Sequence, residues 1–162
     1  MFSQLGLSPI VCSSLSKLGF ETPTPIQTKA IPLVMSGVDL LARAQTGTGK
    51  TAAFGLPMIE HLLARPVAGT ARRQRALVLV PTRELAGQVN SALATYGAPA
   101  HIRVTAIFGG VPMGAQIQAL RNVDIIVATP GRLIDHLQRR TVDLSGIEVL
   151  TLDEADRMLD MG

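Results

Sequence analysis

A loop rich in glycine and threonine follows the first apolar run of the chain and precedes a stretch with helical periodicity. It reads AQTGTGKT over residues 44–51. In a strand–loop–helix unit, backbone N–H groups and the dipole of the helix N-terminus bind phosphate. Gly47 and Gly49 would let the backbone approach a nucleotide. Lys50 would neutralise the β- and γ-phosphates, and the Thr51 hydroxyl would bind Mg²⁺. Because alanine replaces the first glycine of the general phosphate-loop pattern, a glycine-rich turn with a chance lysine stays open as the alternative.

An acidic cluster, DEAD at residues 153–156, follows the last apolar run. Carboxylates directly after a strand suit a Mg²⁺ site. Asp153 would hold the metal directly or through water, and Glu154 would orient or deprotonate an attacking water. The alternative is the first turn of a helix, where acidic side chains interact favourably with the helix dipole. The phosphate loop upstream favours the metal site.

Apolar runs and helical stretches alternate along the chain. The runs predict strands, and the stretches between them predict helices. Because two parallel strands need a long crossover, this alternation predicts an α/β fold: a parallel sheet with helices on both faces and ligands at the carboxyl ends of the strands. Two further helical stretches precede the first strand, at 8–19 and 23–37. The predicted strands are 38–44, 75–81, 101–110, 124–130 and 147–155, and the predicted helices between them are 50–63, 82–96, 113–121 and 131–139.

Composition narrows the class of protein. The chain has 162 residues, 47% of them hydrophobic, which is enough to bury the core of one domain. Its one cysteine, Cys12, excludes an internal disulfide and favours a reducing compartment. No signal peptide or membrane span is recognisable, so we expect a soluble, cytoplasmic protein. The net charge of +3 fits a polyanionic partner without requiring one. For the basic run ARRQR at 71–75, a solvated loop is favoured over a phosphate-binding patch.

The phosphate loop and the acidic cluster together resemble those of the DEAD-box RNA helicases, and other segments agree in their order. GFETPTPIQ at 19–27 resembles the adenine-recognition segment of that family, the Q motif, with Phe2 as its isolated upstream aromatic residue. PTRELAGQ at 81–88, the glycine pair at 109–110 and TPGR at 129–132 resemble its RNA-contacting segments. The alanine of the phosphate loop is usual in the family. FSQLGLSP and DEADRMLDMG are closest to the bacterial RhlE-type subfamily.

The resemblance implies roles for individual residues. Phe20 would stack on adenine, Thr22 would lie beside it, and Gln27 would hydrogen-bond the base edge and select ATP. Lys50, Asp153 and Glu154 would be catalytic, and Thr51 and Asp153 would hold Mg²⁺. The rest of the ATP site would comprise Thr46, Gly47, Thr48 and Gly49. The backbone of single-stranded RNA, which carries no sequence information, would be bound by Pro81, Thr82, Arg83, Gly109, Gly110, Thr129, Pro130, Gly131 and Arg132.

For the RNA segments, ordinary structural readings remain open. The glycine pair could be a turn, Thr82 and Thr129 could be helix caps, and Arg83 could be a surface charge. Each of these structural readings is plausible for a single segment. The presence of five segments in the order found in the family favours a role in ATP and RNA binding instead.

The family has two RecA-like domains that bind ATP and RNA across the cleft between them. The resemblance implies an N-terminal flank with the Q motif over residues 1–36 and an incomplete RecA-like, ATP-binding P-loop core over 37–162, truncated at its C-terminal end. The second domain and the Ser-Ala-Thr strand would be absent. Since that strand lies between the phosphate-loop strand and the DEAD strand, its absence would leave a gap or an open edge.

We therefore expect the N-terminal part of an ATP-dependent RNA helicase, which binds ATP–Mg²⁺ and single-stranded RNA but remodels RNA only with the second domain. Two alternatives remain. One is a non-catalytic, nucleotide-dependent RNA-binding or adaptor module. The other is a DNA motor of the same superfamily.

Overall fold

The computed structural model describes residues 1–69 and 73–160. These residues divide into two compact units. The first unit comprises residues 1–66 and 95–101, and the second comprises the described residues of 67–94 and 102–162. Along the described residues, no helix combines the length and the apolar character needed to cross a membrane.

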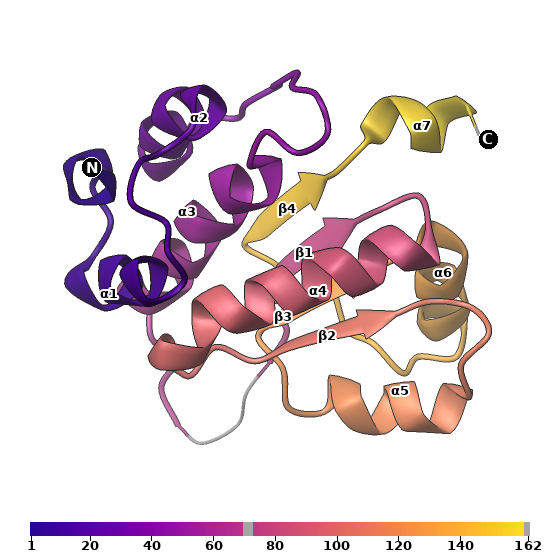
Figure 1. Ribbon diagram of the computed structural model, residues 1–162. Coiled ribbons are helices and arrows are strands. Elements are labelled where there is room, and N and C mark those ends of the chain that lie inside the picture. Colours follow the sequence, from indigo (N-terminus) through magenta and orange to yellow (C-terminus); the bar gives the residue numbers. More distant parts are fainter. Residues whose placement is uncertain (70–72, 161–162) are drawn as a thin grey trace. The chain divides into compact units, whose positions relative to one another are not determined.

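The first unit is helical. A short 3₁₀ helix, η1 (Phe2–Leu5), is followed by α1 (Pro9–Lys17), α2 (Pro25–Met35) and α3 (Lys50–Ala64), and η2 (Ala98–Ala100) belongs to the same unit (Figure 1). Both α1 and α2 begin with proline, whose fixed φ suits the first helical position. α2 packs against α3. These elements confirm the helices predicted at 8–19, 23–37 and 50–63.

The second unit contains a four-stranded parallel sheet. Its strands are β1 (Ala76–Leu79), β2 (Val104–Ile107), β3 (Ile125–Ala128) and β4 (Val149–Leu152), in the order β2-β3-β1-β4. The register pairs the last residue of β3 with the last residues of β1 and β2, and the last residue of β1 with that of β4. The four strands therefore end at one edge of the sheet.

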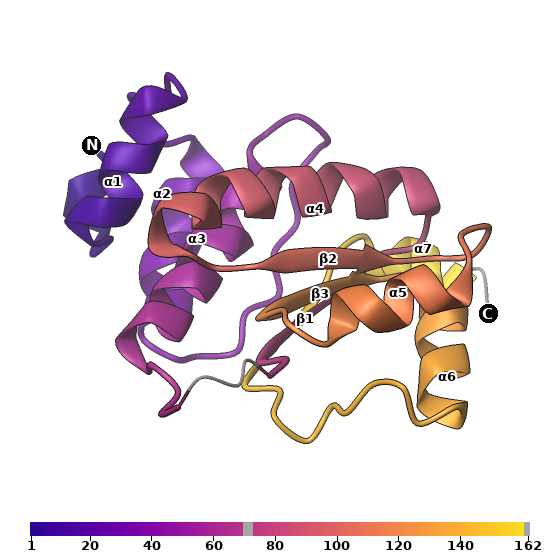
Figure 2. The same cartoon turned by 90° about the horizontal axis from the view of Figure 1, so that it is seen from below.

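Helices cover this sheet on two sides. α4 (Arg83–Gly97) lies along one face, and α5 (Met113–Leu120) lies on the opposite face (Figure 2). α5 and the next helix, α6 (Pro130–Gln138), contribute Leu120 and Leu133 to a core cluster with Leu77, Ile107 and Ile126 from the strands. A short helix, α7 (Ala155–Asp160), follows β4. The predicted parallel α/β fold is confirmed.

The predicted strand at 38–44 is wrong. These residues have no regular secondary structure, and Leu41 is 90% exposed. An apolar, extended segment becomes a strand only when a neighbour pairs with its backbone groups. Among the described residues, the sheet consists of β1 to β4 alone, and the segment at 38–44 is not one of its strands.

The basic run at 71–75 is not the uniform solvated loop that was expected. Arg72 lies outside the described residues, and Arg73 is exposed. Arg75 is buried and forms an ion pair through Nε with Glu148. The β1–β4 register explains the pair, because it sets Ala76 opposite Val149 and so brings the preceding residues side by side.

Candidate functional site

In the first unit, the loop at 44–51 leads into α3. Gly47 has a φ of 80°, and Gly49, the N-cap residue of α3, has a φ of 85°. Both values lie in the left-handed region, which glycine adopts without the steric penalty of a Cβ atom. Lys50 and Thr51 form the start of α3. Because the first N–H groups of a helix have no partner within it, this end can bind an anion.

A hydrogen-bonded capping box ties the start of α2 to that loop. The Thr24 hydroxyl accepts from the Gln27 N–H, and Gln27 Oε1 accepts from the Thr24 N–H at 3.0 Å. Thr24 Oγ1 also donates to the Thr48 carbonyl at 2.8 Å, and Gln27 Nε2 donates to the Gly49 carbonyl at 3.2 Å. Gln27 is 4% exposed. The structure thus brings the predicted base-reading residue into direct contact with the predicted phosphate loop.

The sequence prediction missed Thr24, although the signal was present. TPIQ has the S/T-x-x-E/Q spacing of a capping box directly before an apolar helical run. Each end of the Gln27 amide keeps one further hydrogen-bonding position, since the amide has two N–H groups and two lone pairs.

Phe20 and Thr22 precede the capping box. Phe20 is 37% exposed and packs against Tyr96, with ring centroids 6.0 Å apart and an interplanar angle of 55°. Thr22 is exposed. Tyr96 is buried, and this burial raises the pKa of its phenol. A partly exposed ring backed by a buried one is suited to stacking on a flat ligand.

In the second unit, a cavity of about 560 Å³ lies at the carboxyl ends of the strands. We call it the strand-end groove. Its lining comes from the loop after β1, the loop after β2, the start of α6 and one acidic residue further along α6. The lining residues are Pro81, Thr82, Arg83, Gly109, Thr129, Gly131, Arg132 and Asp135. The structure therefore gathers most of the predicted RNA-binding residues in one place, while Gly110 and Pro130 adjoin lining residues in the chain.

Some residues in and beside the groove cap a helix or form a turn, as the alternative readings of the sequence expected. Thr82 is a helix cap, since its hydroxyl accepts from the Leu85 N–H at 3.2 Å. Thr129 occupies the N-cap position of α6 without a capping hydrogen bond from its side chain. Arg83 Nη1 donates to the Gly109 carbonyl at 3.4 Å, and Gly110 forms part of a turn with a φ of 83°. A Cβ atom on Gly110 would lie 2.3 Å from Arg83 Nη1.

Arg132 is held by a network of buried polar groups. Its Nη1 donates to the Val111 carbonyl at 2.8 Å and to Gln116 Oε1 at 3.1 Å. Gln116 Nε2 donates to the Phe108 carbonyl at 2.8 Å. The fully buried His136 contacts Gln116 Oε1 through Nε2 at 3.0 Å. The sequence prediction missed Gln116, His136 and Asp135, because neither helical spacing nor composition distinguishes them from ordinary helix residues.

The surroundings of His136 disfavour its charged form. Burial lowers the pKa of this imidazole, Arg132 and Arg139 lower it further, and Asp135 opposes them. On its other side, His136 Nδ1 lies 2.8 Å from Thr141 Oγ1.

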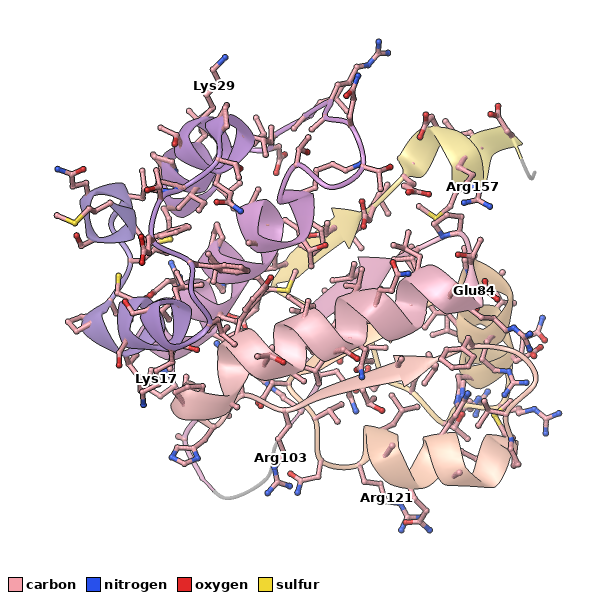
Figure 3. All side chains as sticks on the ribbon, viewed as in Figure 1. Lys17, Lys29, Glu84, Arg103, Arg121 and Arg157 are labelled. Carbon is pink, nitrogen blue, oxygen red and sulfur yellow. The ribbon has the colours of Figure 1, made fainter. Side chains whose placement is uncertain are left out.

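The acidic cluster begins where β4 ends. Asp153 is buried, and its N–H donates to the Leu79 carbonyl at 2.9 Å. Glu154 has a φ of 53°, which is a left-handed conformation that is uncommon outside glycine. Its Oε2 accepts from Nη1 of Arg157 on α7 at 3.5 Å; Figure 3 labels this arginine. Asp156 lies in the first turn of α7, as the helix-start alternative expected.

The chemistry of the predicted metal ligands fits Mg²⁺. Thr51 and Asp153 both offer oxygen, which Mg²⁺ prefers, and Mg²⁺ in proteins usually keeps waters and phosphate oxygens as its other ligands. Among the described residues, no three His, Cys, Asp or Glu side chains cluster as a ready-made metal site. Thr51 belongs to the first unit, and Asp153 belongs to the second.

Comparisons with known proteins agree on one family. The model of the DEAD/DEAH box helicase family matches residues 24–162. The ATP-dependent RNA helicase CshA of Listeria monocytogenes is 49% identical over 162 residues, which are 99% of this chain and 30% of the relative. The chain thus spans about 30% of the length of that relative.

Two solved structures also match. The RNA helicase Prp28 of Chaetomium thermophilum, bound to ADP, has a TM-score of 0.89 and 41% identity, over 98% of this chain and 39% of that one. A hypothetical ATP-dependent RNA helicase of Sulfolobus tokodaii has a TM-score of 0.87 and 39% identity, over 96% and 44% of the two chains. These likenesses confirm the RecA-like fold.

Proposed function

Because this chain belongs to the DEAD/DEAH box helicase family, we propose that it is the N-terminal, ATP- and RNA-binding part of an ATP-dependent RNA helicase. Residues 1–36 would form the flank with the Q motif, and residues 37–162 would form part of the first RecA-like domain. A second RecA-like domain would complete the enzyme. We further propose a cytoplasmic enzyme of the bacterial RhlE type. The observation that carries the proposal is the pair of hydrogen bonds from Thr24 and Gln27 to the phosphate loop.

The first unit would bind the nucleotide. Gln27 would use the remaining N–H and lone pair of its amide on the adenine edge, with Phe20 stacked on the base and Thr22 beside it. Because Gln27 Nε2 already bonds to the Gly49 carbonyl, reading the base and shaping the phosphate loop would depend on one side chain. The phosphates would bind the N–H groups at residues 46–51 and the ammonium of Lys50.

In the proposed ATP site, Mg²⁺ would be held by Thr51, Asp153 and phosphate oxygens, and would neutralise charge on the β- and γ-phosphates. Glu154 would accept a proton from the attacking water. An arginine supplied in cis or in trans is worth roughly 10³–10⁵ in the rate of such phosphoryl transfers. We propose that the second domain supplies it, and that the 162-residue chain alone binds nucleotide without RNA-stimulated turnover or unwinding.

The strand-end groove of the second unit would bind the backbone of single-stranded RNA. Arg83 and Arg132 would contact phosphates, and the threonines and glycines at the strand ends would contact phosphate and ribose. Such contacts give affinity without sequence preference. The proposal for these residues is supported by their gathering in one cavity.

The nucleotide proposal is tested by titrating ATP and GTP into wild type and variants by calorimetry. Gln27→Ala should reduce the preference for ATP over GTP by about tenfold to a hundredfold, in the range for a polar site left unpaired. The preference is a ratio, so a general loss of folding would not imitate this result. Lys50→Ala should weaken ATP binding with or without Mg²⁺, and Lys29→Ala, an exposed change on α2, is its control. Equal affinity of wild type for ATP and GTP would refute the assignment.

Turnover and RNA binding need separate assays. Asp153→Ala should remove mainly the Mg²⁺-dependent part of the ATP affinity. Phosphate release by the 162-residue chain should stay unchanged when single-stranded RNA is added, whereas a severalfold rise would contradict the need for the second domain. Competition between RNA and DNA oligomers of equal sequence should favour RNA. A preference for DNA would support the DNA-motor alternative instead.

A further inference from the structure

We propose that Gln116 and His136 are positioning residues that hold the guanidinium of Arg132 in one orientation, with its Nη2 group free to bind phosphate in the strand-end groove. The inference rests on the proposed RNA-binding function of that groove. It adds two buried residues, which do not line the groove themselves, to the set that controls RNA affinity.

The hydrogen bonds of Arg132 determine which donors remain available. A guanidinium has five N–H groups, two of them on Nη1. Both Nη1 hydrogens have partners, the Val111 carbonyl and Gln116 Oε1. Nε lies 3.7 Å from Asp135 Oδ2 on the same helix. That distance is an ion-pair distance and too long for a hydrogen bond, so among the described residues the two hydrogens on Nη2 and the one on Nε are left for a ligand. Since Arg132 lines the cavity and its side chain is 14% exposed, these donors have a restricted range of directions.

Gln116 can hold the arginine because its own amide orientation is determined. Its Nε2 donates to the Phe108 carbonyl, so its Oε1 is the acceptor. That oxygen receives hydrogen bonds from Arg132 and from His136. Phe108 belongs to the loop after β2, and Arg132 belongs to α6. Gln116 therefore joins two segments of the groove through one buried side chain.

His136 in turn holds Gln116. Because Gln116 Oε1 can only accept, the proton of the neutral imidazole must lie on Nε2. In this neutral ring Nδ1 carries no proton and accepts from the Thr141 hydroxyl at 2.8 Å, so the single proton of that hydroxyl points to Nδ1 rather than to the His136 carbonyl, which lies 3.1 Å from the same oxygen. The ring is fully buried and its two nitrogens are both engaged, so it cannot turn without losing both partners. The depressed pKa of this buried ring agrees with the neutral form.

A polar network of this kind restricts the side chain that binds the ligand before binding occurs. An arginine ordered in advance loses less rotamer freedom when phosphate arrives, which increases affinity without a new contact. An apolar core at Gln116 and His136 would fill the same space but would leave Arg132 attached only to the Val111 carbonyl and near Asp135. The effect of these residues on RNA should therefore act through Arg132 alone.

The first experiment is a double-mutant cycle on affinity for a fluorescent single-stranded oligouridylate, followed by anisotropy at low salt. Arg132→Ala should weaken binding by about tenfold to a hundredfold, in the range of a hydrogen bond to a charged group. Gln116→Met, which is close to glutamine in volume, and His136→Phe, which keeps a flat ring but is somewhat larger, should each weaken it by roughly twofold to tenfold. In the Arg132→Ala background both should have no further effect. Gln118→Met, an exposed change on the same helix, is the control.

The outcomes separate the inference from the function on which it rests. If Arg132→Ala leaves RNA affinity unchanged, or wild type does not bind the oligomer, the proposed function of the groove fails. If Arg132→Ala weakens binding but the Gln116 and His136 variants do not, or their effects add to that of Arg132→Ala, the inference fails.

A second experiment needs no RNA. Restricted rotation of the Arg132 guanidinium should give separate Nη1 and Nη2 signals in nitrogen-15 NMR spectra of the wild-type chain, and Gln116→Met should merge them. The imidazole nitrogens of His136 should show the neutral form protonated at Nε2. Merged arginine signals in wild type, or the Nδ1-protonated form, would overturn the positioning role. Because these NMR spectra report the orientation of Arg132 without RNA, they distinguish a loss of positioning from weak RNA binding that is caused by lower stability.

Discussion

Replacement of Gly49 by alanine should damage the first unit more than replacement of Gly47, although both glycines have left-handed backbones. Gly47 has a φ of 80°, and an added Cβ atom would meet nothing within 4 Å. Gly49 has a φ of 85°, but its Cβ atom would lie 2.3 Å from Gln27 Nε2 and 3.2 Å from Thr24 Oγ1. Both variants carry the same backbone strain, so the difference between them isolates the contact with the capping box.

The size of that difference follows from the hydrogen bonds of Gln27. A left-handed alanine costs about 1–2 kcal/mol. To escape the new methyl group, the buried Gln27 amide must leave the Gly49 carbonyl and the Thr24 N–H, and each lost hydrogen bond costs about 1 kcal/mol. We therefore expect Gly47→Ala to lower the free energy of unfolding by about 1–2 kcal/mol, and Gly49→Ala by about 2 kcal/mol more.

Urea unfolding followed by circular dichroism measures both values, and a second cycle tests their cause. In a Gln27→Ala background the amide is already gone, so Gly49→Ala should cost no more than Gly47→Ala. ATP affinity should fall in the same order as stability, because the Gly49 carbonyl that loses the Gln27 amide belongs to the proposed phosphate loop. Equal losses for the two glycine variants in the wild-type background, or an excess for Gly49→Ala that persists without Gln27, would refute the reasoning.

Three further predictions concern other contacts. Because the pKa of folded His136 lies below its ordinary value near 6.5, the folded state binds fewer protons than the unfolded state. The free energy of unfolding should therefore fall as the pH drops below 6.5. His136→Gln should flatten this dependence in urea titrations at several pH values, whereas Gln118→Met, an exposed change that alters no titratable group, should not. The buried Glu60 carboxylate accepts hydrogen bonds from the backbone N–H and the hydroxyl of Ser8, at 2.7 Å each. Glu60→Ala should therefore lower the free energy of unfolding by about 1–3 kcal/mol. Glu21→Ala, at an exposed site, should have little effect in the same assay. Tyr96→Ala should weaken ATP binding by about twofold to tenfold in calorimetry through loss of the ring behind Phe20, whereas Tyr96→Phe should preserve it; equal affinities for the alanine variant and wild type would exclude a role in nucleotide binding.

Local patterns predicted the elements whose neighbours the chain itself provides. The strands at 76–79, 104–107, 125–128 and 149–152 lie inside the predicted apolar runs, and each has a partner in the sheet. The same kind of pattern misled at 38–44, because periodicity reports that a segment is apolar and does not report whether another strand is available to pair with it. Propensity is thus sufficient only where topology supplies the partner.

Side chains that depend on distant contacts were harder to predict. Arg75 appeared to be one more charge in a basic run, yet Glu148 holds it in a buried pair. No local rule connects two residues so far apart in sequence. Thr24 was predictable from its capping-box spacing, whereas Gln116 and His136 were not, because their function depends on two helices and a loop that meet only in the folded unit.

The groove shows how these two levels of information combine. Membership in its lining follows from the register, since parallel strands that end together must bring the residues that follow them to one edge. The family resemblance named Thr82, Gly109 and Thr129 as RNA-contacting residues, and all three lie in this lining. The direction in which a lining side chain points depends instead on the buried groups behind it. Gln116, which accepts a hydrogen bond from Arg132, is such a group. Substitutions in the lining should therefore remove whole contacts with a phosphate. Substitutions behind it should leave the contacts possible but less often formed, which is why their effects are expected to be smaller and to disappear when Arg132 is absent.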